Sequence, residues 1–444
     1  MNTAAAPATN IAGSDRFKQR FLYRLIFVSL GGMVLDGYIL GIIGPVTTPM
    51  EHDLHINSLW EGLIAAASLF GILIGSPIGG WAADKFGRKP LFLIDISVFV
   101  VSSALQFVAH DAVSMLLVRL LMGVAIGCEY SVGWPIMSEF SPTRLRGRLL
   151  GALTVFWYVG FMIGYTVGFV LGEYTGLDWR VILGTSTIIA AVILVARIGL
   201  PESPRWLWNE GRQNEARAVV AKYMEADTLD DLVHEEPRKG SFRMLFGPSV
   251  WRATLFCSGF WFCAVSPYFA IATFAGTVLD KYGLGSGLAG GVGLSAVSTA
   301  GVVATVLFLD KAGRRVFTVP PMWLCTVVLG IIGFWVGAPP LMVLALFLIF
   351  SFFNAMANTL TSVYPGEVFP TEIRGIGTGF AAAVSRLGAG AGTFLLPVAI
   401  DNLGTGPSML IAAVVSLLGA LLSQWLAPET RGRSLSEAAA TFSH

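Results

Sequence analysis

The sequence predicts an all-α polytopic membrane protein with twelve transmembrane helices in two six-helix halves. Of its 444 residues, 55% are apolar and only 13% are charged, and the mean hydropathy is +0.70. A soluble domain carries roughly twice that share of charged residues. Apolar segments of spanning length recur along the whole chain, and the charged motifs between them occur twice in the same order.

Twelve apolar segments are long enough for the roughly 20 residues that cross a bilayer core. They lie at 22–50, 59–82, 89–109, 112–138, 147–173, 179–199, 251–281, 286–309, 314–336, 340–366, 376–400 and 406–427. Backbone groups in lipid must be satisfied within the segment, so these runs predict helices. The expected divisions are an N-terminal tail (1–20), a first half (21–199), a linker (200–250), a second half (251–427) and a C-terminal tail (428–444).

Lys and Arg residues gather in alternate loops. On one side they are Arg16, Lys18, Arg20, Arg24, Lys85, Arg88, Lys89, Arg144, Arg146, Arg148, those of 200–250 and 310–315, Arg431 and Arg433. The opposite loops hold little beyond Arg180 and Lys281, against several acidic residues. The positive-inside rule therefore predicts cytoplasmic termini and a cytoplasmic linker, in an inner (plasma) membrane.

Three charged motifs are repeated at an offset of 226–228 residues. Residues 84–89 match 310–315, residues 139–147 match 367–375, and residues 201–205 match 428–432. This order predicts two halves of parallel topology related by an internal repeat. In the linker, an apolar stripe of Ala216, Val219, Val220 and Tyr223 predicts a short amphipathic helix, followed by a less ordered acidic segment at 225–236.

These motifs resemble the major facilitator superfamily, and its sugar-porter-like branch in particular. The pattern GxxxDKxGRK at 80–89, its partial copy at 310–315, PESPRWL at 201–207 and PETRGRSL at 428–435 carry the resemblance. It covers nearly the whole chain. The resemblance implies the major facilitator fold and solute transport by alternating access, in which the two halves rock about a central site.

The chain departs from sugar porters at positions that bear on the solute. Glutamines typical of that branch are missing from the fifth helix (FWYVG, 156–160) and the seventh (GFWFCA, 259–264). The segments 36–38 (DGY), 126–130 (IGCEY) and 385–388 (SRLG) look instead like aromatic-acid, nicotinate and phosphate symporters. The resemblance therefore favours a small organic acid over a sugar.

Ionisable residues inside membrane segments are costly and are candidates for function. Asp36 and Glu129 are expected to exchange protons, because a carboxylate removed from water can take up a proton. Arg119 is expected to pair with Asp36 or to act on a neighbouring carboxylate. A permanent Asp36–Arg119 ion pair and a backbone hydrogen bond of Glu129 are the structural alternatives. Asp95 is interpreted as structural.

The guanidinium of Arg386 offers a planar charged fork that suits a carboxylate or phosphate, unless it pairs permanently with an acid. Asn354 and Asn358 lie one helical turn apart and either bind solute or cross-link helices. The candidate aromatic lining, with packing as the alternative, is Tyr38, Trp157, Tyr158, Trp261 and Tyr268. Glycine stripes on the second and fifth helices fit either sliding helices or static packing.

The loop motifs are expected to act as gates that hold one side of the molecule shut. Asp84 would pair across the interface of the halves, and Arg88 would meet Glu139; charges that only fix topology are the alternative. The gating set is Gly80, Asp84, Gly87, Arg88, Glu139, Arg146, Asp310, Gly313, Arg314, Glu367 and Arg374.

The predicted function is uptake of a small organic solute, such as an aromatic or heterocyclic carboxylate, by a monomeric proton symporter in the lipid bilayer. Alternatives are a sugar, polyol or phosphate symporter, a proton-driven exporter, or a membrane receptor that binds solute without moving it. No spacing typical of an enzyme, a metal site or a cofactor site occurs, and the loop charges do not suggest nucleic acid. The four cysteines, all in apolar runs, are interpreted as packing residues.

Overall fold

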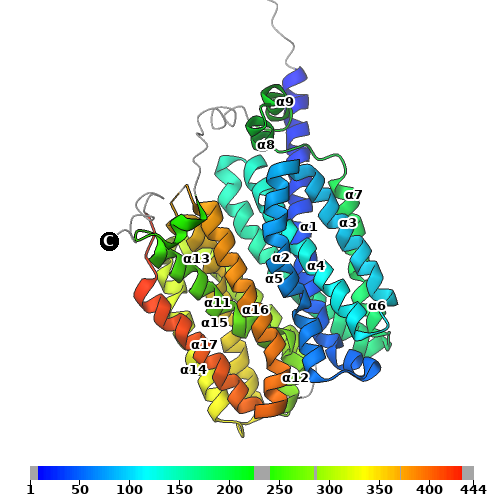
Figure 1. The fold of residues 1–444 in the computed structure, drawn as a ribbon, viewed down its shortest axis with the longest axis vertical. Coiled ribbons are helices and arrows are strands. Elements are labelled where there is room, and N and C mark those ends of the chain that lie inside the picture. Colours follow the sequence, from blue (N-terminus) through cyan, green and yellow to red (C-terminus); the bar gives the residue numbers. More distant parts are fainter. Residues whose placement is uncertain (1–8, 225–240, 285–287, 371, 433–444) are drawn as a thin grey trace, which may run out of the picture.

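The computed structural model describes residues 9–224, 241–284, 288–370 and 372–432. Within these ranges, twelve helical segments are long and apolar enough to cross a membrane. They form one helical bundle with two halves side by side, the first blue to green and the second green to red (Figure 1). The predicted all-helical architecture is confirmed.

The first half contains six spans. These are α1 (Thr9–Leu54), α2 (Ser58–Phe86), α3 (Arg88–Leu105), α4 (Ala112–Phe140), α5 (Thr143–Thr175), and a sixth formed by α6 (Trp179–Gly184) and α7 (Ser186–Arg197). A short 3-10 turn, η1 (Gln106–Val108), follows α3.

The second half repeats this arrangement. Its spans are α11 (Trp251–Thr273) continued by α12 (Ala275–Lys281), α13 (Leu288–Ala312), α14 (Val319–Phe334), α15 (Pro340–Val368), α16 (Arg374–Leu403) and α17 (Thr405–Leu426). The 3-10 turns η2 (Phe242–Phe246) and η3 (Arg315–Phe317) lie at loop positions. Across the interface of the halves, α2 packs on α16 and α5 packs on α13.

Two short helices occupy the linker. They are α8 (Pro204–Asn209) and α9 (Gln213–Tyr223), and the latter lies against the start of α1 (Figure 1). Tyr223 packs on Phe21 with ring centroids 4.6 Å apart, and Ala216 and Val220 are buried. The amphipathic helix predicted for the linker is thus confirmed, while the predicted acidic segment 225–236 lies outside the described residues. The end of the bundle that carries α8 and α9 is called the linker end below.

The glycine stripes bring helices of the same half into close contact. A Cβ atom on Gly160 of α5 would lie 2.2 Å from the carbonyl oxygen of Val34 on α1. A Cβ atom on Gly75 of α2 would lie 2.1 Å from the carbonyl oxygen of Val124 on α4. Small residues at such crossings let two backbones touch, which is how helices associate in lipid. These stripes therefore pack each half internally, and static packing is the alternative that the structure supports.

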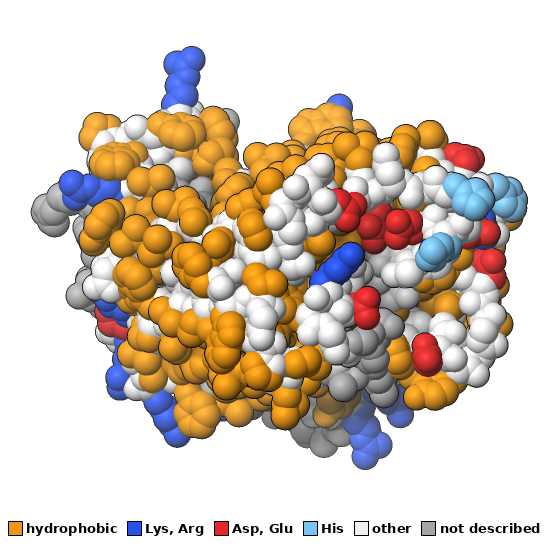
Figure 2. All heavy atoms as spheres, turned by 90° about the horizontal axis from the view of Figure 1, so that it is seen from below, with side chains coloured by type: hydrophobic (Ala, Val, Ile, Leu, Met, Phe, Trp, Pro, Cys, Tyr) orange, Lys and Arg blue, Asp and Glu red, His pale blue; other side chains and the backbone are white. Residues whose placement is uncertain are grey.

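The halves meet tightly at the end opposite the linker end. A Cβ atom on Gly62 of α2 would lie 2.3 Å from the carbonyl oxygen of Phe394 on α16. One on Gly44 of α1 would lie 2.5 Å from the carbonyl oxygen of Thr273 on α11. Figure 2 looks onto this end, where Asp, Glu and His side chains gather over part of the surface.

Replacement of Gly75 by alanine is expected to destabilise the protein by about 1–3 kcal/mol, because the new methyl group would overlap the Val124 carbonyl. The apparent melting temperature of the detergent-solubilised protein measures this. Gly80→Ala is the matched control on the same helix, since its Cβ atom would come no closer than 3.9 Å to Ser131 Oγ. Equal melting temperatures for the two variants would contradict the assigned packing.

Candidate functional site

A buried ion cluster lies inside the first half. Arg197, at the end of α7, donates from Nη2 to Oε1 of Glu129 at 2.7 Å and from Nη1 to Oδ1 of Asp95 at 3.0 Å. All three side chains are almost completely inaccessible to solvent. Helix packing thus gives Glu129 a basic partner, Arg197, from another span. We call Asp95, Glu129 and Arg197 the N-half triad.

Asp36 lies beside this triad on α1. It is fully buried, and neither carboxylate oxygen has a hydrogen-bond partner in the described part of the chain. Its electrostatic neighbours are Glu129, Arg197 and Asp95. Gly32, one turn earlier on the same face of α1, makes room for the triad: a Cβ atom there would lie 2.5 Å from Glu129 Oε1.

Arg119 does not pair with Asp36, which corrects the expected ion pair. Its Nη2 donates to the carbonyl oxygen of Ile39 at 3.2 Å, and its Nε and Nη1 have no partner among the described residues. The physical reason is position along α4. Glu129 follows Arg119 by ten residues, or about 15 Å along α4. The charged neighbours of Asp36 are Glu129, Arg197 and Asp95, and Arg119 is not among them.

Aromatic side chains from both halves form a second cluster. Trp157 of α5 packs on Tyr158 and on Phe269 of α11, with centroid distances of 5.1 and 5.8 Å. Tyr268 of α11 packs on Tyr158 with ring centroids 5.7 Å apart, and the two hydroxyl groups are electrostatic neighbours. Because α5 and α11 belong to different halves, this cluster lies at their interface.

Tyr130 of α4 completes the cluster. Its hydroxyl accepts a hydrogen bond from Trp157 Nε1 at 2.9 Å. We call Tyr130, Trp157, Tyr158, Tyr268 and Phe269 the aromatic junction.

Arg386 of α16 adds a positive charge to the aromatic junction. It is only 9% exposed, and its Cζ atom lies 5.8 Å from the Phe269 ring centroid. Its electrostatic neighbours are the hydroxyl groups of Tyr130 and Tyr158. Among the described residues it has neither an ion pair nor a hydrogen bond, so the expected alternative of a permanent pair with an acid is not met.

Asn354 and Asn358 cross-link helices. Asn354 Nδ2 donates to the carbonyl oxygen of Ala264 on α11 at 3.1 Å, and Asn358 Nδ2 donates to Asn354 Oδ1 at 2.7 Å. The predicted common face is confirmed. The Oδ1 atom of Asn358 is buried without a partner in the described region, so one amide oxygen remains available.

Two expected aromatic residues lie outside the aromatic junction. The hydroxyl of Tyr38 is 2.6 Å from Thr185 Oγ1, inside an apolar core of the first half around Trp179. Trp261 is partly buried and packs against two apolar cores, one of which spans both halves and contains Tyr158, Tyr268 and Phe269.

The loop motifs of the first half form a polar cluster at the linker end. Arg88 binds Glu139, as the sequence predicts, and Ser203 donates to Glu139 at 2.5 Å. Glu202 accepts the backbone N–H of Arg88 at 2.9 Å. Gly87 adopts φ +97°, and a Cβ atom there would lie 2.5 Å from Glu202 Oε2, so the turn requires glycine.

The second half repeats these contacts with the equivalent residues. Arg314 donates to Glu367 at 2.7 Å, and Thr430 also binds Glu367. Glu429 accepts the backbone N–H groups of Arg314 and Arg315, each at 3.0 Å, beside Gly313 at φ +89°. Partial burial raises the pKa of Glu429, but these N–H groups and that of Arg431 outweigh it, and the net pKa is lowered.

Each of these clusters lies within one half. The expected pairing of Asp84 across the interface is not present: its side chain is exposed, and its carbonyl oxygen accepts from Trp206 Nε1 on the linker helix α8. Asp310 makes an exposed contact with Arg314 at 3.3 Å. Arg146 Nε is buried without a partner among the described residues, and Arg374 Nε donates to the carbonyl oxygen of Phe369.

Sequence reasoning missed Arg197, and it assigned Asp95 a merely structural place. Arg197 could have been found as an ionisable residue at the end of an apolar span, because such residues are candidates for function. Phe269 carried no signal, because one more phenylalanine in an apolar span is ordinary.

The whole chain matches known transporters. The sequence profile described as "Sugar (and other) transporter" matches residues 25–442. The inner membrane metabolite transport protein YgcS of Escherichia coli (strain K12) is 34% identical over 94% of this chain and 93% of that protein. The niacin transporter NiaP of Acinetobacter baylyi is 25% identical over 94% of this chain and 96% of that protein.

Solved structures show the same fold. The inward open conformation of the xylose transporter XylE from E. coli superposes with a TM-score of 0.79, covering 95% of this chain and all of that one at 20% identity. The profile match and the relative at 34% identity give the conclusion: this chain belongs to the sugar (and other) transporter family of the major facilitator superfamily, and it is a multi-pass membrane transporter of small molecules, not an enzyme.

Proposed function

We propose that this protein is a monomeric, proton-coupled symporter that takes up a small aromatic or heterocyclic carboxylate. The observation that carries this proposal is Arg386, a buried guanidinium at the interface of the halves without an acidic partner among the described residues. Removing a charge from water costs several kcal/mol unless a counter-charge compensates. A bound carboxylate would supply that counter-charge and would be held bidentately.

The aromatic junction favours a flat ring on the acid. Aromatic rings prefer offset or edge-to-face contacts with another ring, each worth about 0.5–1.5 kcal/mol beyond burial. Trp157, Tyr158 and Tyr268 could provide such contacts beside Arg386, and the hydroxyl group of Tyr158 could donate to the acid. The relative named as a niacin transporter is consistent with this class of solute.

A sugar or polyol is the second candidate. The buried, unpartnered Oδ1 of Asn358 and the hydroxyl groups of the aromatic junction could bind neutral hydroxyl groups. A structural neighbour is named as a xylose transporter, but at 20% identity that likeness speaks only to the fold. We favour the acid because a sugar would leave Arg386 without a counter-charge.

Proton coupling is assigned to Asp36 and Glu129. Asp36 is an electrostatic neighbour of the N-half triad and of Tyr130, and Tyr130 in turn neighbours Arg386. A proton on Asp36 would remove a buried negative charge that repels an entering carboxylate. Loading of proton and acid together would then be favoured over loading of either alone.

The linker end is assigned to the cytoplasm. It carries the basic loop motifs, whereas the opposite end presents Asp, Glu and His side chains (Figure 2). The tight contacts of Gly62 and Gly44 between the halves lie at that opposite end. We infer that the conformation described is closed toward the outside, and that the clusters of Arg88 and Arg314 brace each half as it rocks.

Replacement of Arg386 by glutamine is expected to weaken binding of benzoate about 10- to 100-fold, because a charged hydrogen bond contributes about 1.5–3 kcal/mol. Thermal shift and calorimetry of the purified protein measure this, with uncharged benzamide as the matched ligand. Arg386→Lys tests the planar fork, and exposed Arg148→Gln is the control. Stabilisation by xylose or glucose but not by any acid would favour the sugar candidate instead.

Asp36→Asn is expected to abolish proton-driven accumulation of solute while preserving its exchange across the membrane. The variant cannot release the proton that couples the two gradients, yet it keeps the solute contacts. Uptake into proteoliposomes with and without a pH gradient measures both activities, and Asp401→Asn at the exposed opposite end is the control. Full accumulation by Asp36→Asn would remove this residue from the proton path.

Reporter fusions test the orientation. Green fluorescent protein joined to the C-terminus is expected to fluoresce and alkaline phosphatase at the same site to be inactive, since the first matures only in the cytoplasm and the second only outside it. A phosphatase fused in the loop between α1 and α2 is expected to be active. The reverse pattern would overturn the assignment.

A further inference from the structure

The N-half triad lies inside the first half, beside Tyr130 of the aromatic junction. Its members come from α3, α4 and α7, and α1 closes it through Gly32. Arg197 also donates to the carbonyl oxygen of Phe92 at 2.9 Å, and its Cζ atom lies 3.6 Å from the Phe92 ring centroid. These contacts fix the guanidinium within one half, while the aromatic junction lies between the halves.

The charges of this region do not balance. Asp36, Asp95 and Glu129 are three carboxylates, and Arg197 is the one guanidinium that bonds to any of them among the described residues, which leaves a net charge of −2 if all are ionised. Asp95 and Glu129 are electrostatic neighbours, and both bond to the same guanidinium of Arg197. Two carboxylates held this close repel each other, which favours uptake of a proton by one of them.

The unbonded atoms of the triad leave room for that proton. Oδ2 of Asp95, Oε2 of Glu129 and Nε of Arg197 are all buried without a partner in the described region. The other titratable groups that face the triad are Asp36 from α1, together with Cys128 and Tyr130 from α4. Among these, a carboxyl group removed from water can take up a proton.

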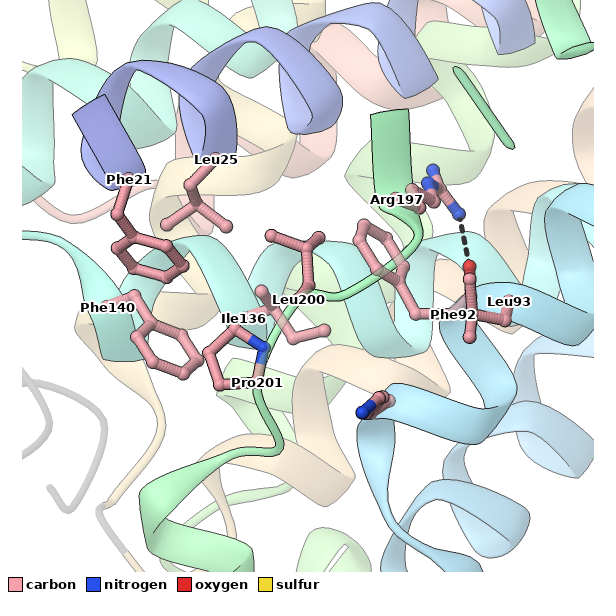
Figure 3. Close-up of a pocket in the computed structure, with 10 residues that line it drawn as sticks. Phe21, Leu25, Phe92, Leu93, Ile136, Phe140, Arg197, Leu200 and Pro201 are labelled. Atoms are coloured by element: carbon pink, nitrogen blue, oxygen red, sulfur yellow. Dashed lines mark hydrogen bonds between the residues drawn. The ribbon is translucent and has the colours of Figure 1, made fainter. Parts of the chain in front are cut away.

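A small cavity, lined by residues of α1, α3, α4 and the end of α7, lies beside Arg197 (Figure 3). Arg197 and Lys89 are its charged lining residues, and apolar side chains form the remainder of the wall. These are Phe21, Leu25, Phe92, Leu93, Ile136, Phe140, Leu200 and Pro201. The lining thus includes Arg197 of the triad and Phe21, which packs on Tyr223 of α9 at the linker end.

We propose that Asp95, Glu129 and Arg197 form a proton-holding triad that exchanges its proton with water on the linker side through this cavity. In this step the O–H bond of the protonated member of the Asp95–Glu129 pair breaks, and the proton passes to water in the cavity. Arg197 is a positioning residue that stabilises the remaining carboxylates. The role in transport rests on the proton-coupled function proposed above.

Because the triad lies inside the first half and the proposed solute site lies between the halves, the two have distinct functions. Protons would leave through the first half, while solute would leave between the halves. Release of one would therefore not require the other to move aside.

Infrared spectra of the purified protein at increasing pH test the triad directly. The carbonyl band of protonated carboxylic acid is expected to disappear with rising pH in the native protein and to be lost or reduced at every pH in Asp95→Asn and Glu129→Gln. Arg197→Lys, which keeps the charge, is expected to shift the pH at which the band disappears. Asp401→Asn is the control. A band that persists unchanged in both Asp95→Asn and Glu129→Gln would overturn the proposal.

Leu93→Phe tests the route, because it narrows the cavity. The loss of the band after a pH jump is expected to slow severalfold, whereas Ile94→Phe, on the adjacent and mostly exposed side chain, leaves the rate unchanged. Equal rates in both variants would overturn the route. If the band titrates as expected but no solute is accumulated on a proton gradient, the proposed function fails and the triad still stands.

Discussion

The hydrocarbon environment is the constraint on which the rest of the structure depends, because it supplies no water to charges or to backbone groups. Every span therefore satisfies its backbone internally, and each charge inside the bundle must find a partner or serve a function. Arg197 finds two carboxylates and a carbonyl oxygen. Arg386 has the Phe269 ring near its guanidinium and no ion pair among the described residues, and this difference is the basis on which we propose a proton site and a distinct solute site.

The two halves share the contacts of their loop motifs, but their buried charged residues differ. Glu202 and Glu429 accept the backbone N–H groups of equivalent turns, beside glycines of equivalent conformation. Glu139 and Glu367 bind equivalent arginines. The buried charges of the spans, by contrast, differ between the halves. Each half thus has the same Arg–Glu cluster in its loops, whereas the charged residues inside its spans are different.

Much of the site could be predicted where the partners lie in motifs with fixed loops. The contact of Arg88 with Glu139 follows from two motifs that both end spans at the same side of the membrane. The predicted contact of Asp36 with Arg119 was wrong, because these two residues lie inside spans and not in loop motifs. Nothing in the sequence fixes how far α1 slides along α4, and the register of these two helices decides whether Arg119 or Glu129 is the neighbour of Asp36.

The sequence by itself determined the class of protein, the twelve spans, the repeat and the identity of the buried charges, because hydropathy and loop motifs are local properties. Only the tertiary structure decided which charges meet. Arg197 reaches Asp95 and Glu129 from positions about 102 and 68 residues away in the chain. The small residues Gly32 and Gly75 set how closely the helices approach, and side-chain packing at that distance selects the partners.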